Sequence, residues 1–466
     1  MSIAERIYPF LPIWAQNLAC SYYGSRERRI RFSESFDKRL AWLRESEFWS
    51  ASEILAYKDD QIKSIVKHAY DTVPYYRNLF GSRRLKPSDI KGVADLDKIP
   101  ILTKDDIRAH SKDLVSSAYR RQKLVERHTS GTTGTSLHLY ADRDEIAFQW
   151  AVWWRHRLRF DCAPGDLHVN FTGKPIVPID QQKPPYWRYV KPQNQYVVNM
   201  HHITPSKIRD VVSFLNSIIP KFYSGYPSII SEVARLALEK KLALDPRSRP
   251  KVIFAGAEAV QELQGRLLEE WTGAIITDEY GFTEGAGNAS RCKQNCYHED
   301  FEFGHLECSQ PEDVGNNHTR GNIITTGFSR KAMPLIRYRV GDSATWESPE
   351  FRCACGRKSA VILAIDGRSE DYVLTPEGRR IMRFDYIFKD THSIREAQVC
   401  QCALGEIIIK VVITPDYKKS DEEELRRLVA RWISPQLKVI IEPVKALERE
   451  ANGKLRAVRS TINTRS

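Results

Sequence analysis

The chain has 466 residues, of which 42% are hydrophobic, and its 71 basic and 59 acidic side chains give a formal net charge of +12. This length exceeds one ordinary hydrophobic core, so we expect two or more domains. The sequence contains neither a run of about 18 apolar residues nor a basic stretch followed by an apolar leader, so we expect a cytoplasmic protein without a transmembrane segment. The positive charge suits long-range attraction of anionic ligands. Motifs of nucleic-acid-binding proteins do not accompany it, which argues against that class.

An aromatic and apolar segment, residues 7–23, lies close to the first residue. Pro9 and Pro12 are expected to break any long helix there. We therefore interpret the segment as a strand or a short helix packed on the body of the protein. The alternative is shallow docking on a membrane surface or on a partner.

Hydrophobic spacing predicts a layered α/β architecture for most of the chain. Apolar residues at helical spacing among charges predict helices over residues 34–70. Further along, short apolar runs alternate with amphipathic segments, which is typical of α/β layers. The expected strands are 167–171, 221–223, 252–255 and 275–276, the expected helices are 208–219, 228–240 and 261–272, and a meander of strands is expected over 304–346.

The same patterns predict two domains, a large one of residues 1–366 and a small α+β domain of residues 367–466. In the small domain an amphipathic helix over 422–433 is expected to begin near Ser420, a good cap, and to end at Pro435. The strands expected in the small domain are 398–401, 406–413 and 439–442.

Residues 129–136, TSGTTGTS, form a run of hydroxyls and glycines with almost no bulk. The two glycines free the backbone to turn with converging N–H groups, and the hydroxyls surround the same point, a concavity that suits nucleotide phosphates. The run lacks the Gly-Lys-Ser/Thr ending of a P-loop, and a flexible loop is the alternative. The candidate phosphate-binding residues are Ser130, Gly131, Thr132, Thr133 and Gly134.

Further motifs follow downstream: DEYGFTE at 278–284, PLIRYRVGD at 334–342, IDGRSED at 365–371 and NGK at 452–454. With these motifs in this order, and with the N-terminal stretches 67–77 and 99–107, the sequence resembles the adenylate-forming superfamily. Within it, the sequence resembles the phenylacetate–coenzyme A ligase-like branch that also occurs in capsular-polysaccharide loci. The resemblance covers nearly the whole chain. It implies a large layered α/β domain followed by a small, mobile α+β domain.

The resemblance implies ATP-dependent activation of a carboxylic acid through an acyl-adenylate. It places Glu284 on Mg²⁺, Thr283 at the α-phosphate and Tyr280 against the adenine ring. One carboxylate can accept bonds from both ribose hydroxyls, which is the role implied for Asp342, and Arg368 would reach the ribose or a phosphate. The other residues expected to border the nucleotide are Gly256, Ala257, Glu258 and Gly281.

Lys454, on a turn of the small domain, would bridge the carboxylate and the α-phosphate and would leave the site when that domain rotates. Glu370 occupies the position where the family commonly has a hinge aspartate. Thr135 and Ser136 stand where the family's loop usually carries a lysine. Aromatic side chains in the acid pocket would favour an apolar or aromatic acid. The residues expected to line that pocket are Tyr223, Gly225, Tyr226 and Pro227, with Trp153, Trp154, His201 and His202 as further candidates and core packing as the alternative for the tryptophans.

Nine unevenly spaced cysteines do not indicate a secreted disulfide framework. The segments 292–298, CKQNCYH, and 353–355, CAC, could together provide a tetrahedral zinc site, and some members of the branch have a similar arrangement. Such a zinc would be structural, because four protein ligands leave no open position. The alternative is a set of reduced surface thiols without a metal. The chosen ligands are Cys292, His298, Cys353 and Cys355, with Cys296 as the rival for the first position.

We therefore predict an AMP-forming acid–thiol ligase whose substrates are a small carboxylic acid and coenzyme A, and we leave its oligomeric state open. Because residues 371–380 resemble the capsule-associated members, an alternative passes the acyl group to an amine or hydroxyl of a polysaccharide or lipid precursor. The alternative of another class is a non-catalytic nucleotide-binding scaffold in polysaccharide assembly. The presence of Glu284, Asp342, Arg368 and Lys454 together argues against a scaffold.

Overall fold

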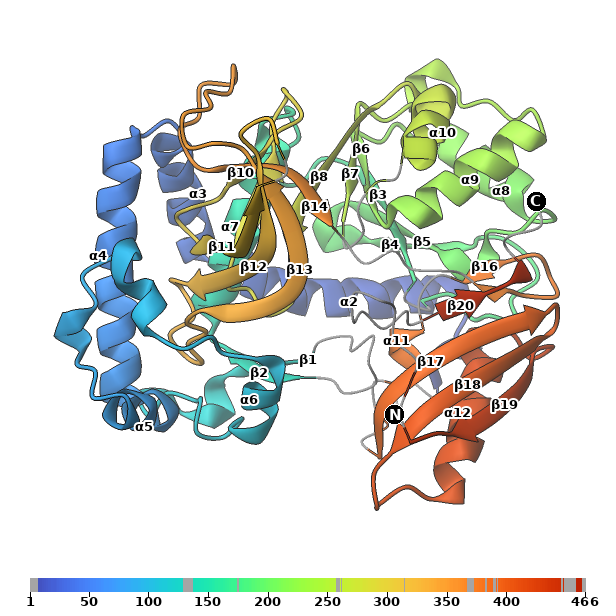
Figure 1. The fold of residues 1–466 in the computed structure, drawn as a ribbon. Helices are drawn as coiled ribbons and strands as arrows, with labels where there is room; N and C mark the ends of the chain where they lie inside the picture. The colour runs from blue at the N-terminus through green and yellow to red at the C-terminus, as the bar shows by residue number, and fades with distance from the viewer. Residues whose placement is uncertain are drawn as a thin grey trace.

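The computed structural model is a mixed α/β protein built around one large sheet, with a second, smaller sheet at the C-terminal end (Figure 1). It describes residues 7–128, 137–173, 176–256, 260, 262–313, 315–366, 373–381, 384–388, 391, 393–445, 447 and 458–462.

The first part of the chain is helical. Ser50 begins the longest of these helices with a capping box, in which its side chain accepts from the Glu53 N–H and the Glu53 carboxylate accepts from the Ser50 N–H. The helices predicted over 34–70 are confirmed. The N-terminal helices are α2 (Ile13–Arg31), α3 (Glu34–Ser46), α4 (Ala51–Thr72), α5 (Pro74–Ser82) and α6 (Lys104–Ala109).

Helix α2 corrects the interpretation of segment 7–23. It is a 19-residue helix that begins directly after Pro12. Both prolines precede its first turn, a position where the missing N–H of proline costs no intrahelical hydrogen bond. The expected strand or short helix is therefore wrong, although the expected packing on the body is correct, because α2 lies against β4 (Trp187–Val190).

The large sheet has the strand order β11-β12-β13-β14-β10-β9-β8-β7-β6-β3-β5-β4. Its neighbours β5, β3, β6, β7 and β8 run parallel, and helices alternate with them along the chain, as the sequence predicts. The bounds are α7 (Arg143–Leu158), β3 (His168–Thr172), β5 (Gln195–Asn199), α8 (Ile208–Asn216), β6 (Phe222–Gly225), α9 (Pro227–Glu239), β7 (Val252–Ala255), α10 (Glu262–Thr272) and β8 (Ile275–Gly281).

Strands β9 to β14 are antiparallel and form the lobe of yellow and orange strands in Figure 1, whereas the edge strand β4 pairs antiparallel with β5 at the other end of the sheet. Strand β8 joins the two parts, since it pairs parallel with β7 and antiparallel with β9. The meander predicted over 304–346 is confirmed as β11, β12 and β13. The bounds are β9 (Asn288–Arg291), β10 (Tyr297–Glu299), β11 (Gly304–Asp313), β12 (Thr319–Gly327), β13 (Tyr338–Trp346) and β14 (Val361–Asp366), and a separate hairpin consists of β1 (Val125–His128) and β2 (His138–Ala141).

The small sheet has the order β19-β18-β17-β20, and its three predicted strands are confirmed. The predicted helix is also present and begins at Lys419, next to Ser420, but Ser420 is not its cap. The Asp421 carboxylate accepts from the Lys418 N–H at 2.9 Å, so Lys418 is the capping position and Ser420 lies inside the first turn. The bounds are β15 (Val373–Leu374), β16 (Arg380–Ile381), α11 (Asp385–Phe388), β17 (Ile394–Ala403), β18 (Glu406–Ile413), α12 (Lys419–Trp432), β19 (Lys438–Pro443) and β20 (Val458–Ser460).

The small sheet packs beside the parallel part of the large sheet. Both contribute to one buried apolar cluster, which runs from Phe171 and Val198 to Val399 and Ile409. Next to this cluster the buried Arg379 donates to the carbonyl oxygen of His201 at 3.4 Å. The same guanidinium donates to the carbonyl oxygen of Ile433, and so ties the segment after β5 to the end of α12.

Candidate active site

Several predicted site residues lie outside the described part of the chain, and their roles stay predictions. They are Ser130, Gly131, Thr132, Thr133, Gly134, Ala257, Glu258, Arg368, Glu370 and Lys454.

The described candidates gather where the parallel strands end. The Gly256 N–H, after β7, donates to the carbonyl oxygen of Gly225 at 2.9 Å, and the Tyr226 N–H donates to that of Phe171 at 3.3 Å. Gly225 has a φ of +128°, and a Cβ there would lie 2.0 Å from the Phe171 oxygen, so only glycine fits. In open α/β sheets this carboxyl edge of the strands is where ligands bind.

Two residues from separate motifs meet at this edge. The phenol of Tyr280, near the end of β8, donates to Oδ2 of Asp342 on β13 at 3.0 Å. Gly341, directly before Asp342, has a φ of +99°, which turns the strand at that point. The arrangement places an aromatic ring and a carboxylate side by side, which suits an adenine base and the hydroxyls of its ribose.

Glu284 is buried and held from two sides. The phenol of Tyr338 donates to its Oε1 at 2.7 Å. The fully buried Arg330 donates to its main-chain oxygen and, at 2.7 Å, to Oε1 of Glu145. Thr283, directly before it, is exposed. A carboxylate fixed in this way next to an exposed hydroxyl suits a divalent cation and a phosphate.

Tyr338 and Arg330 were not among the residues that the sequence singled out for the site. Tyr338 lies within the PLIRYRVGD motif, so its position in that motif was the available signal. Arg330 precedes the motif and carries no comparable signal. Burial raises the pKa of the neighbouring Glu145 to about 7, although Arg330 and Arg127 favour its ionised form.

The acid-pocket candidates divide into two groups. Tyr223 is fully buried, with its ring 5.2 Å from that of Phe171, and Trp154 is also part of the core. Trp153 instead lies beside the end of β8: its Nε1 donates to Oδ1 of Asn288 at 3.1 Å and is 3.6 Å from the place a Cβ of Gly281 would take. The half-buried Tyr226 precedes Pro227, the first residue of α9, while His201 and His202 are buried near Arg379.

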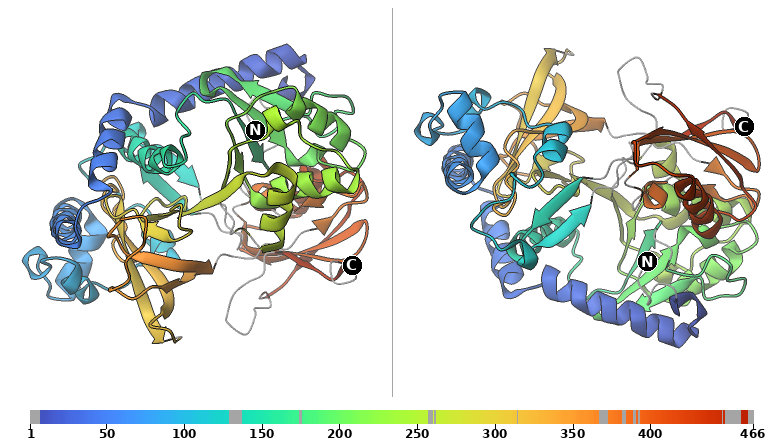
Figure 2. Two further views of the ribbon diagram at one scale, coloured as in Figure 1. Left: turned by 90° about the horizontal axis from the view of Figure 1, so that it is seen from above. Right: turned by 90° about the horizontal axis from the view of Figure 1, so that it is seen from below.

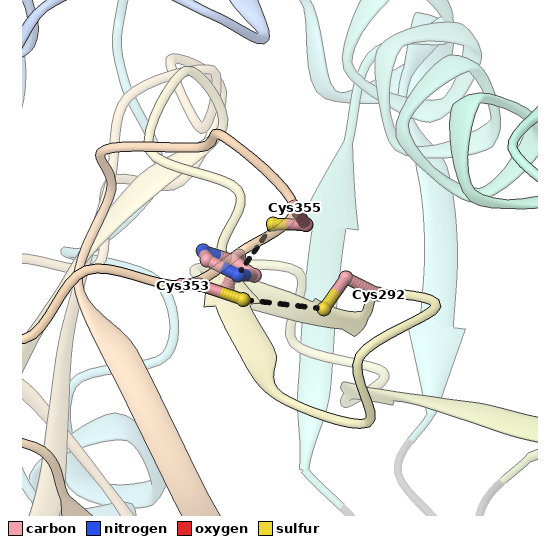
Figure 3. A group of neighbouring side chains, drawn as sticks. Cys292, Cys353 and Cys355 are labelled. Atoms are coloured by element: carbon pink, nitrogen blue, oxygen red, sulfur yellow. Dashed lines mark hydrogen bonds between the residues drawn. The ribbon is translucent and has the colours of Figure 1, made fainter.

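A second candidate site is the cluster of Cys292, His298, Cys353 and Cys355. Their ligand atoms all lie within 4.8 Å of one another. Cys292 Sγ is 3.8 Å from Cys353 Sγ, and Cys355 Sγ is 3.2 Å from His298 Nε2 (Figure 3). The cluster joins the turn between β9 and β10 to the segment between β13 and β14.

The donor set and its spacing fit a structural zinc ion. Two thiolates bound tetrahedrally at about 2.3 Å would have their sulfurs about 3.8 Å apart, which matches the Cys292–Cys353 distance. The Gln294 N–H also points at Cys292 Sγ, at 3.3 Å. The rival ligand Cys296 is outside the cluster, and its Sγ lies 3.6 Å from the carbonyl oxygen of Gln294.

Comparison with known proteins shows which proteins this chain is similar to. Residues 373–461 match the family model of the CapK C-terminal domain. The chain is 26% identical over 418 residues to protein CapK of Staphylococcus aureus, which covers 89% of this chain and 90% of that protein. It is 28% identical over 341 residues to a phenylacetate-coenzyme A ligase of Aromatoleum evansii, which covers 70% of this chain and 72% of that protein.

A crystal structure of 2-hydroxyisobutyryl-CoA ligase in complex with 2-HIB-AMP and CoA aligns with a TM-score of 0.60 and 19% identity, over 90% of this chain and 92% of that one. The fold is therefore that of the adenylate-forming ligases, and the predicted fold class is confirmed. The chain is related to CapK and to the phenylacetate–coenzyme A ligases, so the resemblance inferred from its motifs is confirmed as well.

Proposed function

We propose that this chain is an AMP-forming ligase that activates a carboxylic acid with ATP, through an acyl-adenylate, and transfers the acyl group to coenzyme A. Its relationship to phenylacetate-coenzyme A ligases supports this reaction class. Such a reaction consumes ATP and coenzyme A, so we place the protein in the cytoplasm.

The observation that carries the proposal is the hydrogen bond between Tyr280 and Asp342 at the carboxyl edge of the parallel strands. It brings an aromatic ring and a carboxylate from two separate motifs to one point. Tyr280 would lie against the adenine and Asp342 would accept from the ribose hydroxyls. The buried Glu284 follows Tyr280 on the same strand end, which supports a role close to the phosphates.

Adenylate formation brings two anions together and builds negative charge on the α-phosphoryl oxygens. The bound Mg²⁺ would neutralise part of that charge, and Glu284 is the residue that would hold it. Tyr338 orients the Glu284 carboxylate by donating to Oε1. The hydroxyls of the run 129–136 and the amine of Lys454 would supply the remaining donors, with Lys454 removed again when the small domain rotates about Glu370.

The cluster of Cys292, His298, Cys353 and Cys355 would hold a zinc ion with a structural role. Four protein ligands close its coordination sphere, so it would join two loops of the antiparallel lobe and take no part in the reaction. We place the boundary between the two domains after residue 366, so that the large domain comprises residues 1–366 and the small, rotating domain comprises residues 367–466.

The acyl acceptor has a second candidate. Residues 373–461 match the CapK C-terminal domain, and the alternative for such a protein is transfer to an amine or hydroxyl of a polysaccharide or lipid precursor in place of the thiol of coenzyme A. The two acceptors share the adenylate half-reaction and differ only in the second step.

The test measures acid-dependent exchange of labelled pyrophosphate into ATP across aromatic, aliphatic, amino and sugar acids. We expect exchange with one acid class, its loss in Lys454→Ala, and its retention in Lys438→Ala, a matched control whose exposed amine pairs with Glu406 in the same domain. Adding coenzyme A, or amine and hydroxyl acceptors, to the active acid then identifies the second step.

Exchange that survives Lys454→Ala would overturn the assignment of that lysine. Binding of ATP without pyrophosphate exchange for any acid would favour the non-catalytic scaffold. Thioester formation with coenzyme A would decide against the polysaccharide or lipid acceptor.

A further inference from the structure

Helix α2 carries a row of large apolar side chains that face solvent. Phe10, just before the helix, is 86% exposed, and Trp14, Leu18 and Tyr22 are 67%, 61% and 71% exposed. Trp14, Leu18 and Tyr22 follow one another at intervals of four within the helix, and residues four apart lie above one another on a helix. They form a ridge, here called the α2 ridge, that covers about two helical turns, and Phe10 adds an exposed aromatic ring just before the helix begins.

The opposite face of α2 is polar and fixes the orientation of the ridge. Oε1 of the buried Gln16 accepts from Nε of the fully buried Arg188 at 2.7 Å, and Oδ1 of Asn17 accepts from the Tyr189 N–H at 3.1 Å. A Cβ at Gly24 would lie 2.4 Å from Cγ1 of Val190, so the helix lies close against β4. The helix thus uses specific polar contacts toward the body and turns its aromatic side chains outward, which reverses the usual arrangement of a surface helix.

Basic side chains follow the ridge along the same helix. Arg26 and Arg29 are exposed, while Arg28 donates to the carbonyl oxygen of Pro192. The sequence of α2 contains a single acidic residue, Glu27, which pairs with Arg31. Helix α2 lies along the outer edge of the molecule in both views of Figure 2, so the body of the protein does not cover it. None of the described helices has the length and apolar character needed to cross a bilayer.

We propose that α2 docks the protein on the surface of an anionic lipid bilayer, with the α2 ridge in the interfacial layer and Arg26 and Arg29 against the headgroups. Trp and Tyr prefer this layer because each has an apolar body and a polar tip. An apolar face combined with basic residues is the pattern of helices that lie in the plane of a membrane. The exposed charge beside the ridge, on Arg26 and Arg29, is of one sign, which favours an anionic surface over a protein partner or a second copy. The proposal is independent of the proposed reaction.

The test is co-sedimentation of the full chain with vesicles of phosphatidylcholine alone and of phosphatidylcholine mixed with phosphatidylglycerol. We expect binding to the mixed vesicles, weakened by salt, and about tenfold weaker binding for the double variant Trp14→Ser/Leu18→Ser, a change equivalent to about 1.4 kcal/mol. Arg26→Gln/Arg29→Gln should weaken binding to the mixed vesicles without affecting the fold. The matched controls Ile219→Ser and Leu404→Ser, which remove apolar side chains that are 68% and 59% exposed elsewhere, should bind like the parent.

Circular dichroism and thermal denaturation establish that each variant is folded. Equal binding of the parent and the ridge variant, or failure of the parent to bind the mixed vesicles, overturns the proposal. Sedimentation velocity on the same samples separates the main alternative: a parent dimer that becomes monomeric in Trp14→Ser/Leu18→Ser, without vesicle binding, would assign the ridge to a second copy of the chain.

Discussion

The phenol of Tyr280 on β8 donates a hydrogen bond at 3.0 Å to the carboxylate of Asp342 on β13, a residue 62 positions further along the chain, and so joins two separate motifs. In the order of the large sheet these strands are separated by β9, β10 and β14. The antiparallel lobe must therefore curl back for β13 to reach the end of β8. That curl assembles the proposed nucleotide site from segments that are not neighbours in the sheet.

Loss of the Tyr280 hydroxyl should weaken nucleotide binding modestly. In Tyr280→Phe the ring remains but Asp342 loses a donor that orients it, so we expect a loss of about 1 kcal/mol in ATP binding, or roughly fivefold in Kd. Asp342→Asn should cost more, because it removes the charge itself. Calorimetric titration with ATP checks both variants.

The control for this series is Tyr189→Phe, which removes a tyrosine hydroxyl bonded to Oδ1 of Asn194 at 2.8 Å on the edge strand β4. It should leave ATP binding unchanged. If Tyr280→Phe and Tyr189→Phe gave the same affinity as the parent, Asp342 would not depend on Tyr280 for its position.

Neutralising Glu284 should stop adenylate formation without unfolding the protein. Glu284→Gln retains the shape of the side chain but removes the proposed cation ligand, and we expect pyrophosphate exchange to fall by about 10²- to 10³-fold, as for loss of other groups that stabilise transition-state charge. Tyr338→Phe keeps the carboxylate and should chiefly raise the magnesium concentration needed for half-maximal exchange. Exchange at the parent rate in Glu284→Gln, at saturating magnesium, would remove Glu284 from the reaction.

The sequence predicts much of this site because each motif stands at the end of a strand. Apolar runs such as 252–255 and 275–276 predict buried strands, and polar or glycine residues after them mark the carboxyl edge. The contacts between the motifs could not be predicted in the same way. The Tyr338–Glu284 and Tyr280–Asp342 bonds depend on the curl of the antiparallel lobe, which no local pattern encodes.

Helix α2 shows a second limit of local patterns. Pro9 and Pro12 suggest a broken segment, yet both precede the first turn and leave the helix intact. Which side of α2 faces the body depends on β4, because Arg188 and Tyr189 donate hydrogen bonds to the polar side chains of Gln16 and Asn17. Hydrophobic periodicity alone would have placed Trp14 and Leu18 inward.

The cysteine cluster predicts a metal content that can be measured directly. We expect stoichiometric zinc in the purified protein, with loss of zinc and a lower melting temperature in Cys353→Ser and Cys355→Ser, because the metal joins two loops. Cys296→Ser is the matched control and should retain zinc, since its Sγ is outside the cluster. Parent protein without stoichiometric zinc by plasma mass spectrometry, or zinc lost in Cys296→Ser alone, would contradict the assignment.

A buried ion pair between α4 and β10 should make stability depend on acid pH. Burial alone would raise the pKa of Glu299, but the ammonium of Lys58 and the ring of His305 hold it at about 2, and the Leu306 N–H donates to the same carboxylate at 2.8 Å. Because the folded-state pKa lies below the ordinary value, the carboxylate stabilises the fold fully above about pH 5. That contribution, about 3 kcal/mol, is lost as the pH falls toward 2.

Urea denaturation at a series of pH values between neutral and acid measures this contribution. Glu299→Gln should be less stable at neutral pH, because it leaves the Lys58 charge buried without its partner, and its stability should fall less steeply toward acid. The double variant Lys58→Met/Glu299→Gln removes both charges and should recover much of the neutral-pH loss while keeping the shallow acid dependence. Asp95→Asn, which breaks the more exposed pair with Lys98, should follow the parent curve closely. Parallel acid curves for Glu299→Gln and the parent would show that other carboxylates control acid unfolding.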